Sequence, residues 1–170
     1  MTDVPGMTVP GMTPLPVGSE APDFQLRDQN NEVVTLSSFR GDKAVLLVFY
    51  PWAFTSICTG ELGRLRDNID AFANDRVQVL TLSIDSGFVH KVFAQRDGLN
   101  FPLLADFWPH GAVAQAYGVF NTDAGVSNRG TFLVDTEGII RFSEANEIGI
   151  GRDPEVWLRA IDELASPVAG

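Results

Sequence analysis

The sequence predicts an α/β fold in which helices sandwich a central mixed β-sheet. Two continuous apolar runs, at residues 44–50 and 77–83, are typical of strands that are buried on both faces. Segments with apolar residues at helical spacing separate these runs from later strands, and a strand hairpin and a final helix close the chain. The 170 residues, of which 45% are hydrophobic, suffice for one domain with a substantial core.

The first half of the chain contains a hairpin, two strands and a helix. Apolar and polar residues alternate on either side of a polar turn at residues 29–31, which predicts a β-hairpin. Beyond Cys58, apolar side chains recur every three or four positions from Leu62 to Phe72, as on one face of a helix. The predicted elements are, in order, a hairpin of residues 23–28 and 32–36, a strand at 44–50, a helix after Cys58 and a strand at 77–83.

The second half alternates short helices with short strands. We predict a helix at 87–97, a short apolar strand at 101–105, a small helix at 110–117, strands at 131–135 and 139–143 joined by a turn at 136–138, and an amphipathic helix at 153–164. Strands and helices in this order indicate a sheet with helices on both faces, and the thioredoxin-like fold is one such arrangement.

The first 17 residues differ from the rest in composition. They contain a direct repeat, since residues 4–8 and residues 9–13 both have the sequence VPGMT. Proline and glycine at this density, with few side chains to bury, predict an irregular and flexible segment. We therefore expect a flexible N-terminal tail over residues 1–17, with docking of a partner as the alternative role, and a single domain over residues 18–170.

Composition and charge exclude several classes of partner. The formal net charge of −10 and the lack of a basic cluster argue against nucleic acid and anionic membranes. No apolar run approaches the roughly twenty residues needed to span a bilayer. The N-terminus has no secretory signal, and a single cysteine is compatible with a reducing cytosol. We therefore expect a cytoplasmic protein.

Cys58 is the only cysteine in the chain and the strongest candidate for chemistry. It lies between the apolar run at 44–50 and the predicted helix, so it is close to a helix N-terminus. Unpaired N–H groups and partial positive charge at that end favour a thiolate, which is a strong nucleophile. A lone cysteine is also commonly a small buried apolar residue, and its position alone leaves both interpretations open.

Three further residues could assist such a thiolate. Thr55 lies three positions before Cys58, and its hydroxyl can donate and accept hydrogen bonds. Pro51 has no N–H and a fixed backbone, so it can shield the sulfur without competing for hydrogen bonds. Arg129 comes just before a predicted strand, and its guanidinium would stabilise the thiolate and a leaving oxygen if the fold brings it to Cys58.

The spacing P-x-x-x-T-x-x-C of Pro51, Thr55 and Cys58 resembles the active-site motif of the peroxiredoxin family. The resemblance covers nearly the whole chain beyond the tail. The further matching segments are 17–24, 58–62, 83–86 with His90, and 129–135, the last of which matches the segment with the family's active-site arginine. Residues 106–113 and 116–120 look most like the one-cysteine alkyl hydroperoxide reductase E (AhpE) subgroup. One departure is Phe93, at a position where many relatives carry tryptophan.

The resemblance implies a thioredoxin-like fold and a thiol-dependent peroxidase. The Cys58 thiolate would attack one oxygen of hydrogen peroxide, an organic hydroperoxide or peroxynitrite and become a sulfenic acid. Thr55 and Arg129 would orient the peroxide and stabilise the departing oxygen, and Pro51 would shield the sulfur. Glu61 would support the arginine. The resemblance implies no cofactor and no metal.

The solitary cysteine also implies partners. Because the chain has no resolving cysteine, an external thiol must reduce the sulfenic acid through a mixed disulfide. The resemblance implies a low-molecular-weight thiol such as mycothiol with a glutaredoxin-like mycoredoxin, and thioredoxin is the other candidate. It also implies a homodimer, whose contact would use aromatic residues that could otherwise belong to the core. These aromatic residues are Trp52, Phe54, Phe107, Trp108 and Phe120.

Two other functions stay open. One is a thioredoxin-fold redox-sensing or binding module, in which Cys58 is oxidised but turnover is negligible. The other is a cysteine hydrolase with His90 or His110 as the base, although no spacing places either histidine beside Cys58. The two histidines and the scattered carboxylates lack the spacing of a metal site.

Overall fold

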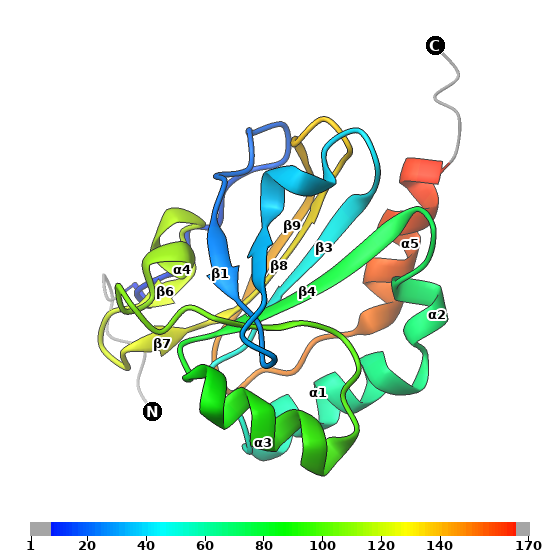
Figure 1. Cartoon of the computed structure of the whole chain (residues 1–170). Coiled ribbons are helices and arrows are strands. Elements are labelled where there is room, and N and C mark those ends of the chain that lie inside the picture. Colours follow the sequence, from blue (N-terminus) through cyan, green and yellow to red (C-terminus); the bar gives the residue numbers. More distant parts are fainter. Residues whose placement is uncertain (1–7, 166–170) are drawn as a thin grey trace.

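A five-stranded mixed sheet forms the centre of the computed structural model, which describes residues 8–165 (Figure 1). In spatial order its strands are β5 (Leu103–Ala105), β4 (Val77–Ser83), β3 (Ala44–Phe49), β8 (Arg129–Val134) and β9 (Ile140–Asn146). β4 is parallel to both β3 and β5, whereas β8 is antiparallel to both β3 and β9. The predicted α/β fold with a mixed sheet is confirmed.

Helices and a hairpin surround this sheet. The helices of the described residues are η1 (Leu36–Phe39, a 3-10 helix), α1 (Ser56–Asp67), α2 (Ile69–Phe72), α3 (Gly87–Asp97), α4 (Ala112–Ala116) and α5 (Pro154–Ala165). The predicted N-terminal hairpin is formed by β1 (Gln25–Arg27) and β2 (Val33–Thr35). A small hairpin that the sequence did not predict is formed by β6 (Phe120–Asn121) and β7 (Val126–Ser127).

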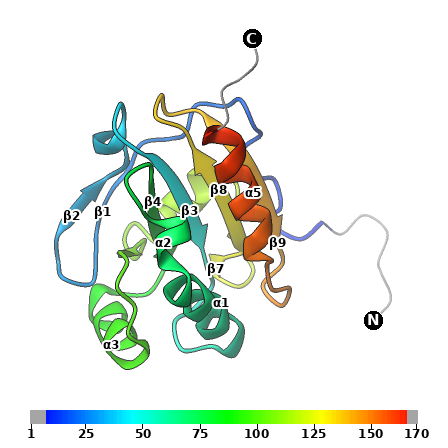
Figure 2. The ribbon, with the colours of Figure 1, turned by 90° about the vertical axis from the view of Figure 1, so that its right-hand side faces the viewer.

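Alternate residues of β3 supply the core on both faces of the sheet, because successive side chains of a strand point to opposite sides. Leu46 and Val48 belong to one buried cluster, together with side chains of α1, α2, α3 and α5. Leu47 and Phe49 belong to a second cluster, together with side chains of η1 and α4. Figure 2 shows α5 lying over β8 and β9, and Figure 1 shows α4 on the opposite side of the sheet. The predicted sandwich of helices around the sheet is thus observed.

The helix predicted after Cys58 differs from the expectation at both ends. It begins at Ser56, so Cys58 lies inside its first turn rather than before it. It then breaks at Asn68, whose backbone is non-helical (φ −125°, ψ 28°), and continues as α2. The Asn68 side chain donates a hydrogen bond to the carbonyl oxygen of Arg64 at 3.0 Å, so it competes with the helical pattern.

Residues 10–15 are attached to the body of the protein, in contrast to the free tail expected from their composition. The Asn128 amide donates hydrogen bonds to the carbonyl oxygens of Pro10 and Gly11 at 2.8 and 3.0 Å. Leu15 packs against the second core cluster. The backbone of this segment finds partners in residues more than a hundred positions away, which composition does not reveal. Most of the first copy of the repeat lies outside the described residues.

Among residues 8–165, no helix is long and apolar enough to cross a membrane.

Candidate active site

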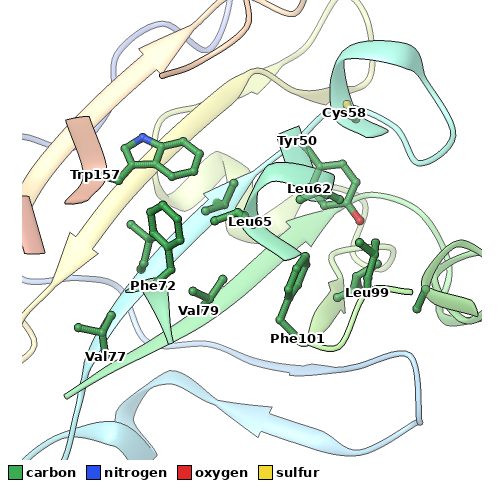
Figure 3. Close-up of a cluster of buried hydrophobic side chains, with 14 of the residues drawn as sticks. Tyr50, Cys58, Leu62, Leu65, Phe72, Val77, Val79, Leu99, Phe101 and Trp157 are labelled. Carbon is green, nitrogen blue, oxygen red and sulfur yellow. The ribbon is translucent and has the colours of Figure 1, made fainter. Parts of the chain in front are cut away.

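Cys58 lies in the first turn of α1, just beyond the end of β3. Thr55 caps this helix with an extended backbone (φ −81°, ψ 154°), and its carbonyl accepts a helical hydrogen bond from Thr59 N at 2.9 Å. The N–H groups of residues 56–58 precede the regular helical bonding, so their partial positive charge favours an anion at the sulfur. Cys58 is fully buried at one end of the cluster that contains Tyr50 (Figure 3).

The structure brings Arg129 to Cys58 across 71 positions of sequence. Arg129 is the first residue of β8, which is antiparallel to β3 and therefore begins near the start of α1. Its Nη1 donates hydrogen bonds to the Cys58 sulfur at 3.4 Å and to Glu61 Oε1 at 2.6 Å. Its Nε donates to the carbonyl oxygen of Ile148 at 2.7 Å, which fixes the plane of the guanidinium. Cys58, Glu61 and Arg129 therefore form one buried cluster.

A second buried guanidinium, that of Arg152, completes this cluster. Its Nε and Nη2 donate to the two oxygens of Glu61 at 3.0 and 2.9 Å, which is the bidentate geometry of a strong arginine–carboxylate pair. Its Nη1 also donates to the carbonyl oxygen of Gly130 at 2.9 Å and to Thr131 Oγ1 at 3.1 Å. Arg152 thus ties the loop before α5 to the start of β8, beside Arg129.

Glu61 is ionised in this environment. Burial raises the pKa of its carboxyl, but the hydrogen bonds and charge of Arg152, with the charge of Arg129, outweigh burial and hold the pKa below its ordinary value. Two guanidinium groups and one carboxylate then leave a charge of +1 in the buried cluster. Because Arg129 contacts the Cys58 sulfur, this excess positive charge faces the thiol.

Arg152 is the site residue that sequence reasoning missed. It lies in the loop before α5 and has no spacing relation to Cys58 or Arg129. The residues around Arg152 in the sequence do not distinguish it from an exposed arginine such as Arg141. Only the packing of that loop against α1 and β8 identifies its role.

Thr55 and Pro51 border the same site. The Thr55 hydroxyl donates its proton to the carbonyl oxygen of Trp52 at 3.0 Å, so its oxygen is left to accept a hydrogen bond. Pro51 is buried two positions beyond the end of β3. Across the part of the chain that is described, no hydrogen bond joins Thr55 to the Cys58 side chain, so the structure places the two residues one helical turn apart without a direct bond.

The two histidines lie away from this cluster. Nε2 of His90 is 2.7 Å from Ser83 Oγ, and Nε2 of His110 is 2.6 Å from the carbonyl oxygen of Gly125. Neither histidine is hydrogen-bonded to Cys58 within residues 8–165, so the site offers no histidine base for a cysteine hydrolase. The same residues contain no group of three or more histidine, cysteine or acidic side chains placed to hold a metal ion.

Comparison with known proteins identifies the family. A family model described as the AhpC/TSA family matches residues 17–143, which is most of the chain. The chain belongs to the AhpC/TSA family. Residues 8–16, which include the whole attached segment of residues 10–15, precede the part that matches the AhpC/TSA model.

Individual AhpC/TSA relatives agree with this assignment. Alkyl hydroperoxide reductase E of Mycobacterium tuberculosis is 55% identical over 152 residues, which cover 89% of this chain and 99% of the relative. The crystal structure of reduced 2-Cys peroxiredoxin from Plasmodium vivax has a TM-score of 0.80 at 32% identity, covering 92% of this chain and 90% of that one. Mycobacterium tuberculosis AhpC has a TM-score of 0.76 at 31% identity, covering 89% and 99%.

These AhpC/TSA relatives confirm the predicted resemblance to peroxiredoxins of the AhpE subgroup and the predicted thioredoxin-like fold. The names of these relatives also allow the number of cysteines to be compared. Several relatives are named 2-Cys peroxiredoxins, whereas this AhpC/TSA chain has Cys58 alone.

Proposed function

We propose that the protein is a thiol-dependent peroxidase whose nucleophile is Cys58. The observation that carries this proposal is the contact of 3.4 Å between Arg129 Nη1 and the buried sulfur. The Arg129 guanidinium would pair with the sulfur when Cys58 is a thiolate, and Glu61, itself paired with Arg152, holds that guanidinium in place. Similarity to alkyl hydroperoxide reductase E supports a peroxide substrate. Hydrogen peroxide, organic hydroperoxides and peroxynitrite are the candidates.

In the proposed reaction, the Cys58 thiolate attacks the terminal oxygen of the peroxide. A sulfur–oxygen bond forms as the O–O bond breaks, so the sulfur is oxidised to a sulfenic acid and the departing oxygen leaves as an anion that takes up a proton. Arg129 donates a hydrogen bond to the departing oxygen, where charge develops. Thr55 accepts a hydrogen bond from the peroxide O–H, since its own proton is engaged by Trp52. Pro51 shields the sulfur from water.

The sulfenic acid requires a thiol from outside the chain, because Cys58 has no cysteine partner. The first external thiol forms a mixed disulfide with Cys58 and releases water, and a second thiol releases the reduced cysteine. We propose mycothiol with a mycoredoxin as the reductant, and thioredoxin as the second candidate. A cytoplasmic location stays a prediction from the sequence.

Stopped-flow mixing of the reduced protein with sub-stoichiometric peroxide tests the proposal. We expect fast oxidation that Cys58→Ser abolishes and that Arg129→Ala slows by about a hundredfold or more, as for loss of a donor to a developing anion. Arg141→Ala is the matched control, because Arg141 is an exposed arginine whose partner is Asp135. Oxidation no faster than that of a free thiol would refute the assignment. Turnover with a supplied thiol distinguishes a peroxidase from a redox-sensing module.

We also propose a homodimer, supported by exposed aromatic side chains. Phe88 is 88% exposed, Trp108 79% and Phe107 55%, and all three line a surface groove of about 730 Å³. An exposed apolar patch of this kind marks an interaction surface. Sedimentation at several concentrations should show a dimer that Trp108→Glu weakens, whereas a monomer at every concentration would contradict the proposal. Phe120, by contrast, packs against the second core cluster.

A further inference from the structure

The attached segment of residues 10–15 contacts the chain directly before the active-site arginine. The side-chain amide of Asn128, which is fully buried, donates to the carbonyl oxygens of Pro10 and Gly11. Asn128 precedes Arg129 in the sequence, so a contact that holds Asn128 also limits the movement of the residue that carries the guanidinium. The attached segment precedes the part of the chain that matches the AhpC/TSA model, so family membership does not account for these contacts.

The start of β8 is paired with the sheet on one side only. The pairing of β8 with β3 begins at Thr131, opposite Val48. In the part of the chain that the structure describes, Arg129 and Gly130 are paired with β9 alone. A strand end with one paired neighbour has fewer backbone hydrogen bonds to hold it than the interior of the strand has. The position of Arg129 therefore depends on contacts from outside the sheet.

Val119 supplies one contact of this kind. Its carbonyl oxygen accepts a hydrogen bond from the backbone N–H of Asn128 at 2.8 Å. Its side chain lies against Gly130, where a Cβ would be 2.8 Å from a Val119 methyl group. Because Gly130 follows Arg129 directly, Val119 contacts the chain both before and after the arginine.

The attached segment also binds the residue before Val119. The backbone N–H of Thr13 donates to the carbonyl oxygen of Gly118 at 3.2 Å. The two backbones approach so closely that a Cβ on Gly118 would overlap the Thr13 carbonyl, and only glycine permits such an approach. In Figure 1 the start of the described chain runs beside α4 and β6. The attached segment thus joins Gly118 to Asn128, and through them it contacts the start of β8.

Gly11 is the residue on which this docking depends. Its φ of +76° lies in the left-handed region, and a Cβ at this position would overlap the carbonyl oxygen of Phe120. The same Cβ would lie 2.9 Å from the amide nitrogen of Asn128. Any side chain at position 11 must therefore move the segment away from both residues. A single substitution at Gly11 tests the docking without a change of charge.

We propose that the attached segment is a positioning element of the peroxidase site, in which Gly11 and Asn128 keep Arg129 in place beside the Cys58 sulfur. This inference rests on the proposed peroxidase function. The Arg129 guanidinium donates to the sulfur at 3.4 Å, and it must also reach the departing oxygen of the peroxide. Hydrogen bonds weaken steeply when donor and acceptor are misaligned, so a displacement of a fraction of an ångström slows the reaction.

Single-turnover oxidation of Cys58 by hydrogen peroxide in the full chain tests the proposal. Misplacement by 1 Å can cost about a hundredfold in rate, and we expect about a third of that displacement at the guanidinium. Gly11→Ala should therefore slow the oxidation by about fivefold. In the Arg129→Ala background the same substitution should have no further effect, because the group through which it acts is absent. Gly18→Ala is the matched control, since Gly18 also has positive φ but a Cβ there would meet no atom within 4 Å.

Asn128→Ala provides a second variant, which removes the donor and leaves the glycine unchanged. It should also slow the oxidation by about fivefold. Because the two substitutions break the same contact, the double variant Gly11→Ala/Asn128→Ala should be no slower than the slower of the two single variants. All rates are compared at equal folded fraction, as measured by circular dichroism.

The nuclear magnetic resonance signal of the Arg129 Nε–H group gives a readout that needs no peroxide. This buried N–H donates to the carbonyl oxygen of Ile148 at 2.7 Å, so its chemical shift reports the position of the guanidinium. Gly11→Ala should shift the signal, and Gly18→Ala should not. Oxidation of the wild-type protein no faster than that of a free thiol would refute the peroxidase function. The Arg129 signal would still decide whether residue 11 is coupled to the arginine.

Several results would overturn the positioning role. Equal slowing by Gly11→Ala with and without Arg129 would show that the substitution acts on the fold as a whole. Unchanged oxidation in Gly11→Ala and Asn128→Ala, or an Arg129 signal that Gly11→Ala does not shift, would show that the attached segment does not position the arginine. Slowing by Gly18→Ala as large as that by Gly11→Ala would show that strain at any nearby glycine is sufficient.

Discussion

Replacing Arg152 with methionine measures how much the buried charge cluster contributes to stability. The arginine side chain donates four hydrogen bonds, two of them to Glu61, and methionine fills part of the same space without any donor. Removing one partner of a buried ion pair costs about 3–5 kcal/mol. Glu61 keeps the Arg129 guanidinium at 2.6 Å and the backbone N–H of residue 152 at 2.9 Å. We therefore expect Arg152→Met to lower the free energy of unfolding by about 3 kcal/mol, which is the lower end of that range.

Urea unfolding followed by tryptophan fluorescence measures this loss. For a domain of this length, about 3 kcal/mol corresponds to a decrease in Tm of about 6–12 °C. Arg141→Met is the control, because Arg141 forms an ion pair of 2.6 Å with Asp135 but is 45% exposed, and such surface pairs contribute about 0–1 kcal/mol. If Arg152→Met costs no more than Arg141→Met, then the buried cluster does not stabilise the fold as argued.

Two further measurements on this variant sharpen the test. Without Arg152 the charge of +1 beside Cys58 falls to zero, so peroxide oxidation should slow by about tenfold, less than the loss of a direct donor costs. In the double variant Glu61→Gln/Arg152→Met, the carboxylate that has lost its Arg152 partner is also removed. The double variant should therefore lose less stability than the sum of the two single variants, whereas additive losses would show that the pair is not coupled.

Two further predictions concern parts of the fold outside this cluster. Burial lowers the pKa of His90 from 6.5 to about 4. Between these two pH values the unfolded chain therefore binds one more proton than the folded protein does. The free energy of unfolding has its full value above pH 6.5 and decreases by about 3 kcal/mol as the pH falls to about 4. Urea unfolding at pH 7.5 and 4.5 should show a smaller loss in His90→Gln than in the wild type, and equal losses would contradict it. Gly11→Ala should lower the Tm of thermal unfolding more than Gly18→Ala does. Both glycines have positive φ, but a Cβ on Gly11 would meet the Phe120 carbonyl, whereas a Cβ on Gly18 would meet no atom within 4 Å. Equal losses would show that the attached N-terminal segment does not add to stability.

The elements with the clearest local pattern were predicted from the sequence. β4 and α3 have the predicted bounds, because a continuous apolar run and the residues that begin and end a helix are local properties. Ser86 caps α3 through its hydroxyl, and Gly98 ends it in a left-handed conformation. The break of the long helix at Asn68 was missed, since it depends on one side chain that competes with the helix backbone.

The N-terminal segment and Arg152 show where local pattern is insufficient. The composition of residues 1–17 predicts a tail, yet residues 10–15 bind to Asn128 and to the second core cluster. In the sequence, Arg152 does not differ from the exposed arginines of the chain. Only the packing of the loop before α5 shows that its side chain is paired with Glu61. Both features arise from contacts between residues that are about a hundred positions apart.

The sequence predicts the order of the main strands and helices and makes Cys58 the candidate nucleophile, because a thiol at a helix start and the periodicity of apolar residues are local properties. The motif of Pro51, Thr55 and Cys58 and the family membership follow from it as well. The tertiary structure alone shows that Arg129 reaches the sulfur, that Arg152 shares Glu61 with it, and that the attached segment binds the residue before Arg129. Those contacts depend on how α1, the loop before α5 and the attached segment pack around the start of β8, and no local pattern encodes the distances between them.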